Sequence, residues 1–378
     1  MNILLILNHH VKGHEGGVER VSFMLAKQFE KNKHKIFYLY KDYIKKFYYN
    51  NIFMFESNGL EIQSKMDSFL YNYDINLVID QIGNIKLNKL IYKNKTKNQI
   101  LVSCFHCQPF SHLYKEKKLI SCFIPHTFKG KLTKNLFSAF PTIARLYYNY
   151  YSKKTIKEQL KYSDKLCLLS EGFIPRIKEN MDIDTKKLIA INNPVEPINR
   201  NELKEKEKII LFVGRINNIV KNLTEFIDIW KELSYSFPNW RAKVIGDGPD
   251  LQFIKNKYKN VLNIEFLGQC SNMKELYEKA SILCLTSVSE GWGMVITEAL
   301  SYSCVPIAYG SYESVYDLIE NGYNGYVIPA FDISKYIEIL KHLMSNEKEL
   351  KRIAENGPIS INKFNLEITV NKWLNLKL

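Results

Sequence analysis

The sequence lacks any apolar run long enough to cross a membrane. No stretch of its 378 residues approaches the roughly 18 consecutive apolar residues that a spanning helix needs. The opening MNILLILNHH has neither a basic leader nor a small-residue cleavage site, so we expect a first β-strand and no signal peptide. The mean hydropathy of −0.23 is typical of a soluble globular protein, and we expect a cytoplasmic one.

Cysteine is scarce and odd in number, which argues against a disulfide framework. Most of the seven cysteines lie in apolar, strand-like runs, as expected of reduced thiols. Cys104, His106 and Cys107 form a C-x-H-C pattern, but the second Cys/His pair that a zinc site requires is missing. We therefore expect no metal site.

Acidic residues are scarce only in the first half. Residues 1–196 contain 31 Lys and Arg against 17 Asp and Glu, whereas residues 197–378 contain 22 of each. A basic half can face nucleic acid, an anionic membrane or an acidic acceptor. The simpler alternative is a lysine-rich composition that places lysines on any solvated face.

A chain of this length exceeds one compact core, so we expect two domains. Short apolar runs alternate with helical or polar segments, which favours a doubly wound α/β architecture. Asn192-Asn193-Pro194 is typical of a turn, and the charged run that follows it indicates a linker. We place the first domain at residues 1–196 and the second at 197–362, with an amphipathic C-terminal helix at about 363–378. Residues 321–329 are rich in glycine and predict a hairpin-like turn.

The stretch from Ser289 to Ala308 contains the clearest candidate site. A strand-like run, Ile282–Leu285, leads into S-E-G-W-G and then into a helix from about Met294. Glycines at such a turn let a ligand approach the backbone, and a helix start favours an anion such as phosphate. Glu298 lies about 6–7 Å inside the helix and could accept hydrogen bonds from a ribose. The alternative is an ordinary αβ-unit with two solvated acids.

Two further loops follow predicted strands in the same way. After Ile3–Leu7 comes a glycine-rich segment that includes Gly16-Gly17, although no G-x-G-x-x-G is present. After Ile209–Val213, Arg215 and Lys221 place two cations near one loop, where they could neutralise a diphosphate. A surface lysine and an ordinary turn remain open as alternatives.

His106 follows the predicted strand Gln99–Phe105, at the sheet edge where ligands bind. It could be a structural histidine or a ligand-facing one. Residues 115–165 hold 12 basic residues against three acids, with many aromatics between them. This mixture suits an anionic lipid surface or a nucleic-acid groove. The alternative is a long packed helix, with Tyr147 and Tyr151 as core contacts.

The E-G-W-G motif and the spacing of Glu290 and Glu298 resemble the signature of the retaining GT-B glycosyltransferases of family 4. These enzymes are of the group 1 type and include bacterial enzymes of surface-glycan, lipopolysaccharide and capsule synthesis. G-G-V-E at residues 16–19 matches a G-G-x-E element, and Arg215 with Lys221 matches a G-R…K element. The sequence departs from the family at one position, since it has Lys221-Asn222 where the family often has K-G. The resemblance is strongest from about Ile209 to Pro329.

The resemblance implies an α/β GT-B fold: two Rossmann-like domains facing across a cleft, with the C-terminal helix crossing back to the first. It implies the catalytic residues Glu290 and His106. It also implies a set of donor-binding residues, whose backbone and side chains contact the nucleotide sugar: Gly16, Gly17, Arg215, Lys221, Gly291, Trp292, Gly293, Met294 and Glu298. No metal ion or other cofactor is implied.

The implied activity is transfer of a hexose, with retention of configuration, from a nucleotide sugar to a glycan or lipid-linked acceptor. A UDP-linked donor is favoured, and GDP-mannose is the alternative. The basic half would then dock peripherally on an anionic membrane. An epimerase or a phosphorylase of the same fold remains open. A nucleic-acid-binding protein without activity is a further alternative, but no RRM, helix-turn-helix or zinc pattern occurs, so we expect no nucleic acid partner.

Overall fold

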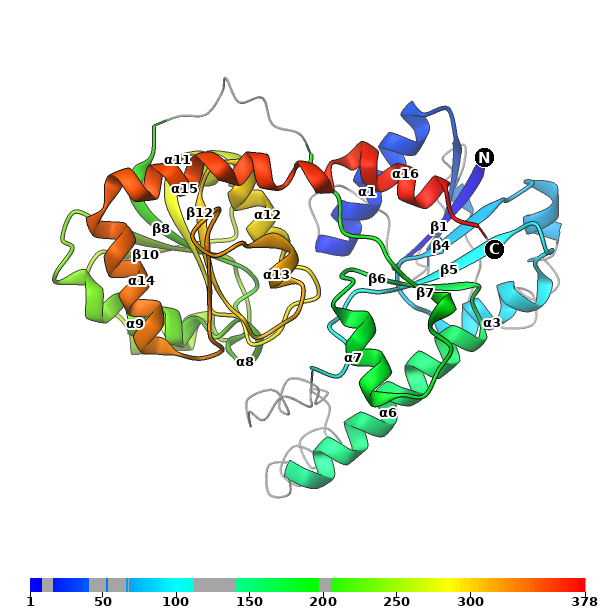
Figure 1. Cartoon of the computed structure of the whole chain (residues 1–378), viewed down its shortest axis with the longest axis horizontal. Helices are drawn as coiled ribbons and strands as arrows, with labels where there is room; N and C mark the ends of the chain where they lie inside the picture. Colours follow the sequence, from blue (N-terminus) through cyan, green and yellow to red (C-terminus); the bar gives the residue numbers. More distant parts are fainter. Residues whose placement is uncertain are drawn as a thin grey trace. The chain divides into compact units, whose positions relative to one another are not determined.

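A computed structural model describes most of the chain as two compact units (Figure 1). The described residues are 1–8, 16–40, 52–53, 66, 68–111, 141–196 and 205–377. The first unit comprises Met1–Pro109, Tyr150–Glu196 and Phe364–Leu378, and the second comprises Phe110–Asn149 and Pro197–Lys363. Residues 110–149, which we expected in the first domain, group with the second unit. Most of them lie outside the described residues, and one continuous helix crosses this boundary.

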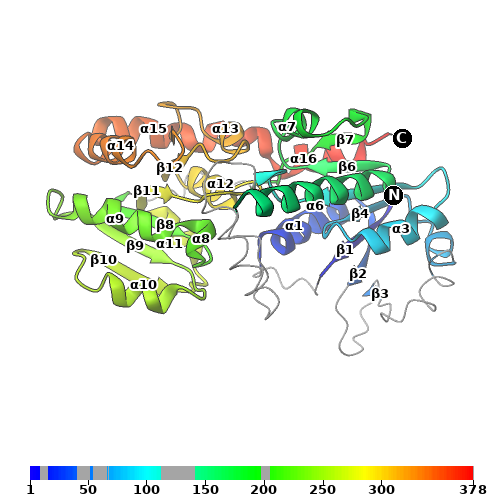
Figure 2. The same ribbon diagram turned by 90° about the horizontal axis from the view of Figure 1, so that it is seen from below.

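The first unit is built on a parallel sheet of seven strands in the order β3-β2-β1-β4-β5-β6-β7. Figure 2 shows this order from β7 at the top to β3 at the bottom. Its strands are β1 (Asn2–Leu7), β2 (Lys35–Tyr40), β3 (Ile52–Phe53), β4 (Leu77–Asp80), β5 (Ile100–Phe105), β6 (Lys165–Leu168) and β7 (Leu188–Ala190). The apolar run in β1 is buried from Ile3 to Leu7, as expected for a parallel strand covered on both faces.

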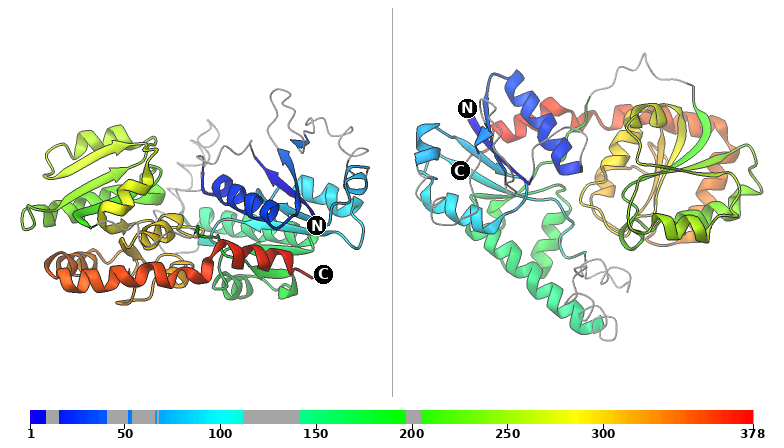
Figure 3. Two further views of the ribbon diagram at one scale, coloured as in Figure 1. Left: turned by 90° about the horizontal axis from the view of Figure 1, so that it is seen from above. Right: turned by 180° about the vertical axis from the view of Figure 1, so that it is seen from behind.

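The helices of the first unit include the C-terminal one, which returns to it. They are α1 (Gly17–Lys31), α3 (Ile85–Asn94), α7 (Phe173–Asn180), α16 (Leu366–Leu374) and the part of α6 (Pro141–Lys161) from Tyr150 onwards, with a 3-10 turn at Thr185–Lys187. Helix α16 lies against α1 (Figure 3), and Val195 pairs with Asn365 beside it. The tail helix is shorter than predicted, because Asn365 caps its start and residues 362–364 form a separate 3-10 turn.

The second unit repeats the plan with six parallel strands in the order β10-β9-β8-β11-β12-β13. They are β8 (Glu207–Val213), β9 (Arg241–Ile245), β10 (Ile264–Gly268), β11 (Ala280–Leu285), β12 (Val305–Tyr309) and β13 (Tyr326–Ile328). Its helices are α8 (Asn218–Lys221), α9 (Leu223–Ser234), α10 (Leu251–Lys257), α11 (Met273–Lys279), α12 (Met294–Ser301), α13 (Val315–Leu318), α14 (Ile333–Ser345) and α15 (Glu347–Ser360). One core cluster joins strand residues such as Phe212 to Trp230 of α9 and Tyr336 of α14.

The predicted hairpin-like turn at residues 321–329 is wrong in one respect. A tight turn does form, because the Gly322 N–H donates to the carbonyl of Gly325 at 3.0 Å. The strand that follows does not fold back as a hairpin, however. Strand β13 pairs in parallel with β12 at the sheet edge, where Tyr309 lies opposite Ile328.

Candidate functional site

Both sheets reverse their strand order at one place, between β1 and β4 in the first unit and between β8 and β11 in the second. The loops that leave the carboxyl ends of two such strands diverge, and open α/β sheets bind ligands there. In the second unit these two loops carry Arg215, Lys221 and Glu290. The fold therefore gathers the predicted donor-binding residues of this unit at one edge of one sheet.

Lys221 and Glu290 form an ion pair at this edge. Lys221 ends α8, and its Nζ lies 2.5 Å from Oε1 of Glu290, with the two side chains 19% and 13% exposed. Backbone contacts join the two loops, since the Val288 N–H donates to the Val220 carbonyl at 2.8 Å. The Thr286 hydroxyl also donates to the Asn222 carbonyl at 3.0 Å. The structure thus brings together two residues that the sequence separates by 69 positions.

Asn222 has the backbone conformation that a glycine usually adopts. Its φ of 52° and ψ of 44° lie in the left-handed region, between the end of α8 and the start of α9. Asparagine tolerates this region better than other residues with a side chain. The departure from the K-G pattern therefore preserves the turn. The buried Nδ2 of Asn222 has no hydrogen-bond partner in the described part of the chain.

A second loop, after β9, packs directly on the Arg215 loop. A Cβ on Gly246 would overlap the carbonyl oxygen of Gly214, and one on Gly248 would overlap that of Ile216. The Ile216 N–H donates to the carbonyl of Asp247 at 2.8 Å, which fixes the two loops together. This close approach requires glycine at both positions. Arg215 itself is exposed, so its guanidinium is accessible to solvent and to a ligand.

Helix α12 begins at this edge with a glycine. Gly293 is its N-cap, with a φ of 92° and a ψ of 53°, and glycine has no side chain to bond to the first turn. The start of a helix carries backbone N–H groups and a partial positive charge that favour an anionic ligand. Trp292 is buried, and its carbonyl accepts a hydrogen bond from the Ser314 hydroxyl at 3.3 Å. Gly291 and Met294 are half-buried beside it.

Glu298 lies one turn into α12 and is half-buried. The Tyr277 hydroxyl donates to its Oε2 at 2.8 Å. Sequence reasoning missed Tyr277, because one tyrosine on a short amphipathic helix is indistinguishable from a core residue. It also missed Gln81, a glutamine after β4 that no motif marks.

His106 follows β5 in the first unit and bonds to the neighbouring strand end. Its Nε2 lies 2.8 Å from Oε1 of Gln81, which follows β4 and is buried. Because the amide oxygen only accepts, Nε2 carries the proton and Nδ1 is left as an acceptor. Burial lowers the pKa of His106 to about 4, so the imidazole is neutral at pH 7. A small crevice beside it is also lined by Cys104, Cys167 and Trp373.

The other predicted elements of the first unit are described only in part. Gly16 and Gly17 are exposed at the start of α1, where Gly16 is the N-cap. The rest of the glycine-rich segment, residues 9–15, lies outside the described residues.

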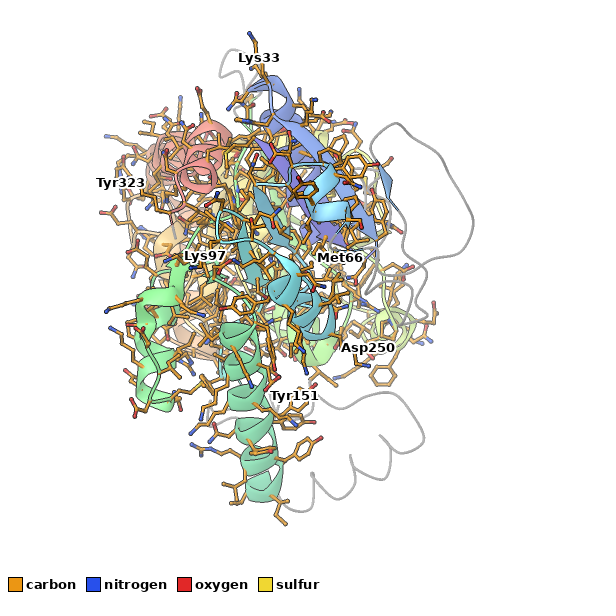
Figure 4. All side chains as sticks on the ribbon, turned by 90° about the vertical axis from the view of Figure 1, so that its right-hand side faces the viewer. Lys33, Met66, Lys97, Tyr151, Asp250 and Tyr323 are labelled. Atoms are coloured by element: carbon orange, nitrogen blue, oxygen red, sulfur yellow. The ribbon has the colours of Figure 1, made fainter. Side chains whose placement is uncertain are left out.

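Helix α6 carries the described part of the basic and aromatic segment, of which residues 112–140 are not described. Tyr147 and Tyr151 are 53% and 59% exposed, so the alternative that made them core contacts is wrong. Figure 4 shows Tyr151 on this helix. Within the part of the chain that the structure describes, no helix is both long and apolar enough to span a bilayer.

Comparison with known proteins adds sequence relatives. The model of the family "Glycosyl transferases group 1" matches residues 196–359. An alpha-1,4-N-acetyl-D-galactosaminyltransferase of Campylobacter jejuni, named for a PP-undecaprenol-linked glycan, is 30% identical over 174 residues. That match covers 46% of this chain and 48% of the relative, so the matched part spans about half its length. A lipopolysaccharide 1,6-galactosyltransferase of Salmonella typhimurium is 24% identical over 82% of this chain and 88% of its own length.

A solved structure agrees over the whole chain. A variant of TarM from S. aureus, bound to fondaparinux, alpha-GlcNAc-glycerol and UDP, superposes with a TM-score of 0.75. The match covers 99% of both chains at 14% identity, which establishes the fold alone. Residues 196–359 thus match the domain of the group 1 glycosyl transferases, and the chain has a GT-B fold.

Proposed function

We propose that this protein transfers a hexose from a UDP-sugar, with retention of configuration, to a glycan or lipid-linked acceptor in cell-surface polysaccharide synthesis. The observation that carries the proposal is the contact between Lys221 and Glu290 at the switch point of the second unit, next to the start of α12 at Gly293. The UDP in the TarM structure and the PP-undecaprenol-linked glycan in the name of the C. jejuni relative support the donor and acceptor classes.

The leaving nucleotide diphosphate is the group that most needs stabilisation in such a transfer. Arg215, Lys221 and the backbone of Gly291, Trp292, Gly293 and Met294 would supply cations and N–H donors to it. Donors that are already in place stabilise developing charge at little cost in reorganisation. We propose on this basis that no metal ion is required.

The remaining groups would hold the sugars of the donor. Glu298 would accept hydrogen bonds from the ribose, and Glu290 would bond to a hydroxyl of the transferred hexose. His106 and the Gly16-Gly17 backbone would be the first unit's contribution to that hexose. Nδ1 of a neutral His106 can accept a hydrogen bond from a sugar hydroxyl.

We also propose a cytoplasmic protein that docks peripherally on an anionic membrane. The support is α6, where exposed aromatic side chains share one helix with lysines and a single acid, Glu158. Flotation of the protein with vesicles of anionic lipid, and its failure with neutral lipid, is the expected result. Equal flotation with both, or with neither, would contradict docking through charge.

The activity is tested by incubating the protein with UDP-glucose, UDP-galactose, their N-acetyl forms and GDP-mannose, and measuring release of the nucleoside diphosphate. We expect release from one UDP-sugar, unaffected by EDTA, and an α-linked product by NMR when an acceptor is present. Release from GDP-mannose alone would replace the donor assignment. No release from any nucleotide sugar, with salt-sensitive binding to nucleic acid instead, would overturn the function.

A further inference from the structure

We infer that Tyr277 is a positioning residue for Glu298, and that Lys206 fixes Tyr277 in place. The inference rests on the proposed function in one respect, namely that Glu298 binds the ribose of the donor. It adds two residues to that role, neither of which reaches a ligand. Both belong to the second unit, so the argument stays within one compact body.

Tyr277 contacts Glu298 through its only polar side-chain atom. The tyrosine is 1% exposed, lies on α11, and donates its hydroxyl to Oε2 of Glu298 at 2.8 Å. A hydrogen bond to a carboxylate that is partly shielded from water is stronger than one between neutral groups. The contact therefore favours one rotamer of a side chain that has three rotatable bonds.

The ring of Tyr277 is fixed by a second tyrosine. It stacks on Tyr302 with parallel planes 2° apart and centroids separated by 6.1 Å. Tyr302 is the C-cap of α12, the helix that carries Glu298. The stack thus sets the distance between α11 and the end of α12, and with it the direction from which the hydroxyl reaches Glu298.

Lys206 ties the ends of these two helices together. Its Nζ donates to the carbonyl of Tyr277 at 2.8 Å and to that of Tyr302 at 2.5 Å. Both carbonyls lie at the C-terminal ends of their helices, where backbone acceptors lack partners and the dipole is negative. Burial lowers the pKa of Lys206, and the nearby Glu278 and Cys304 oppose this shift. One ammonium group therefore satisfies two helix ends.

The consequence is a carboxylate that is already oriented before the donor binds. Holding a flexible side chain in its bound rotamer removes an entropy cost from binding. A ribose has two adjacent hydroxyls that can donate hydrogen bonds to a carboxylate of fixed orientation. A dideoxyribose has hydrogen atoms at these two positions and cannot form these bonds. Tyr277 should therefore increase the preference for UDP over a nucleotide that lacks both hydroxyls.

The test compares UDP with 2′,3′-dideoxy-UDP by isothermal titration calorimetry on the full chain. For Tyr277→Phe we expect UDP to bind about tenfold more weakly, with dideoxy-UDP unchanged, as for loss of one hydrogen bond to a charged group. Tyr235→Phe is the matched control, because Tyr235 is 73% exposed and distant in sequence from α11 and α12. A general loss of structure would weaken the binding of both ligands equally. The ratio of the two affinities therefore separates a positioning role from destabilisation of the fold.

A double-mutant cycle gives the second readout. In a Glu298→Ala background, Tyr277→Phe should change UDP affinity much less than in the wild type, because the hydrogen bond is already removed. The inference would be overturned if Tyr277→Phe left the ratio of UDP affinity to dideoxy-UDP affinity unchanged. It would also be overturned if the effects of the two substitutions on the free energy of UDP binding were fully additive. If the wild type binds no UDP, the proposed donor fails. The inference is then decided by the crystal structure of unliganded Tyr277→Phe, where it requires more than one Glu298 rotamer and a single unchanged rotamer refutes it.

Lys206→Met tests the other half of the inference. It keeps most of the side-chain volume but removes the ammonium group, so two helix ends lose their donor. We expect a lower melting temperature and a reduced ratio of UDP affinity to dideoxy-UDP affinity. A lower melting temperature with a wild-type ratio would remove Lys206 from the positioning role.

Discussion

Nζ of Lys221 lies 2.5 Å from Oε1 of Glu290, so the cation expected on the diphosphate and the acid expected on the sugar are bonded to each other. A donor diphosphate must therefore compete with Glu290 for Lys221. The Glu290 carboxylate also offsets the cost of partly burying the Lys221 ammonium group. The ion pair sets the first prediction.

Glu290→Gln and Lys221→Ala should affect UDP binding in opposite directions. Removing the Glu290 charge leaves Lys221 to the diphosphate alone, so we expect UDP to bind a few-fold more tightly. Lys221→Ala removes the cation and leaves Glu290 to repel the phosphates, so we expect UDP to bind at least about tenfold more weakly. Calorimetry with UDP measures both.

Turnover is the second property that the Glu290 change should affect. Glu290→Gln should lower kcat for sugar transfer even though UDP binds more tightly, because its proposed partner is a sugar hydroxyl. Lys231→Ala is a suitable control, since Lys231 lies in the last turn of α9. Weaker UDP binding in Glu290→Gln would show that the carboxylate does not compete with the diphosphate.

Gly293→Ala should weaken UDP binding by moving the start of α12. The glycine has a φ of 92°, and a Cβ there would lie 3.3 Å from Cδ1 of Ile296 and 3.5 Å from the Tyr312 hydroxyl. Gly322→Ala is the matched control, with a φ of 73° and no heavy atom within 4 Å of the added Cβ. Both changes should cost about 1–2 kcal/mol of backbone strain.

Urea unfolding and UDP titration of the two variants separate strain from function. We expect similar losses of stability and a loss of UDP affinity in Gly293→Ala only. Equal UDP affinity in both variants would mean that the helix start does not contact the nucleotide.

The fold was largely predictable because most of the parallel strands contain a continuous apolar run. The expected run Ile282–Leu285 forms the last four residues of β11, and the expected strand Gln99–Phe105 is β5 apart from its first residue. Strand β13 was missed because three residues after a glycine-rich turn carry no periodic pattern. Parallel pairing with β12 depends on contacts distant in sequence, and local residue patterns do not contain them.

The site was predictable only where a motif marks it. Glu290, Gly293 and Glu298 belong to such a motif. Lys206 lies in a charged run that reads as a linker, yet it donates to two helix ends. Its role depends on where α11 and α12 end in space. The pairing of Lys221 with Glu290 was likewise not predictable, because the resemblance assigns Lys221 to the diphosphate of the donor and Glu290 to its sugar.

Asn222→Gly and Asn222→Ala should differ in stability by about 1 kcal/mol in favour of glycine. Both remove the same buried amide, which has no partner in the described part of the chain, so their difference isolates the backbone conformation. Glycine adopts a φ of 52° without strain, whereas alanine does not. Urea unfolding of the two variants measures the difference. Equal stabilities would mean that the turn does not keep its left-handed residue in solution.

His106 and Asp80 should oppose each other in the pH dependence of stability. Burial lowers the pKa of His106 from 6.5 to about 4, so the unfolded chain binds this proton more readily and stability falls as pH drops from 6.5 towards 4. Burial raises the pKa of Asp80 from 3.8 to about 6, against opposing hydrogen bonds from the Ile82 and Asn84 backbone. Here the folded chain binds the proton more readily, so stability falls as pH rises from 3.8 to 6.

Replacing either group should therefore expose the effect of the other. In His106→Gln the contribution of Asp80 is no longer opposed by that of His106, so the free energy of unfolding should decrease as pH rises from 4 to 6. In Asp80→Asn, which keeps an acceptor for the backbone N–H groups, it should increase with pH from 4 to 6.5, more steeply than in the wild type. Urea unfolding at half-unit pH steps measures each slope. The same slope in both variants would contradict the opposite pKa shifts of His106 and Asp80.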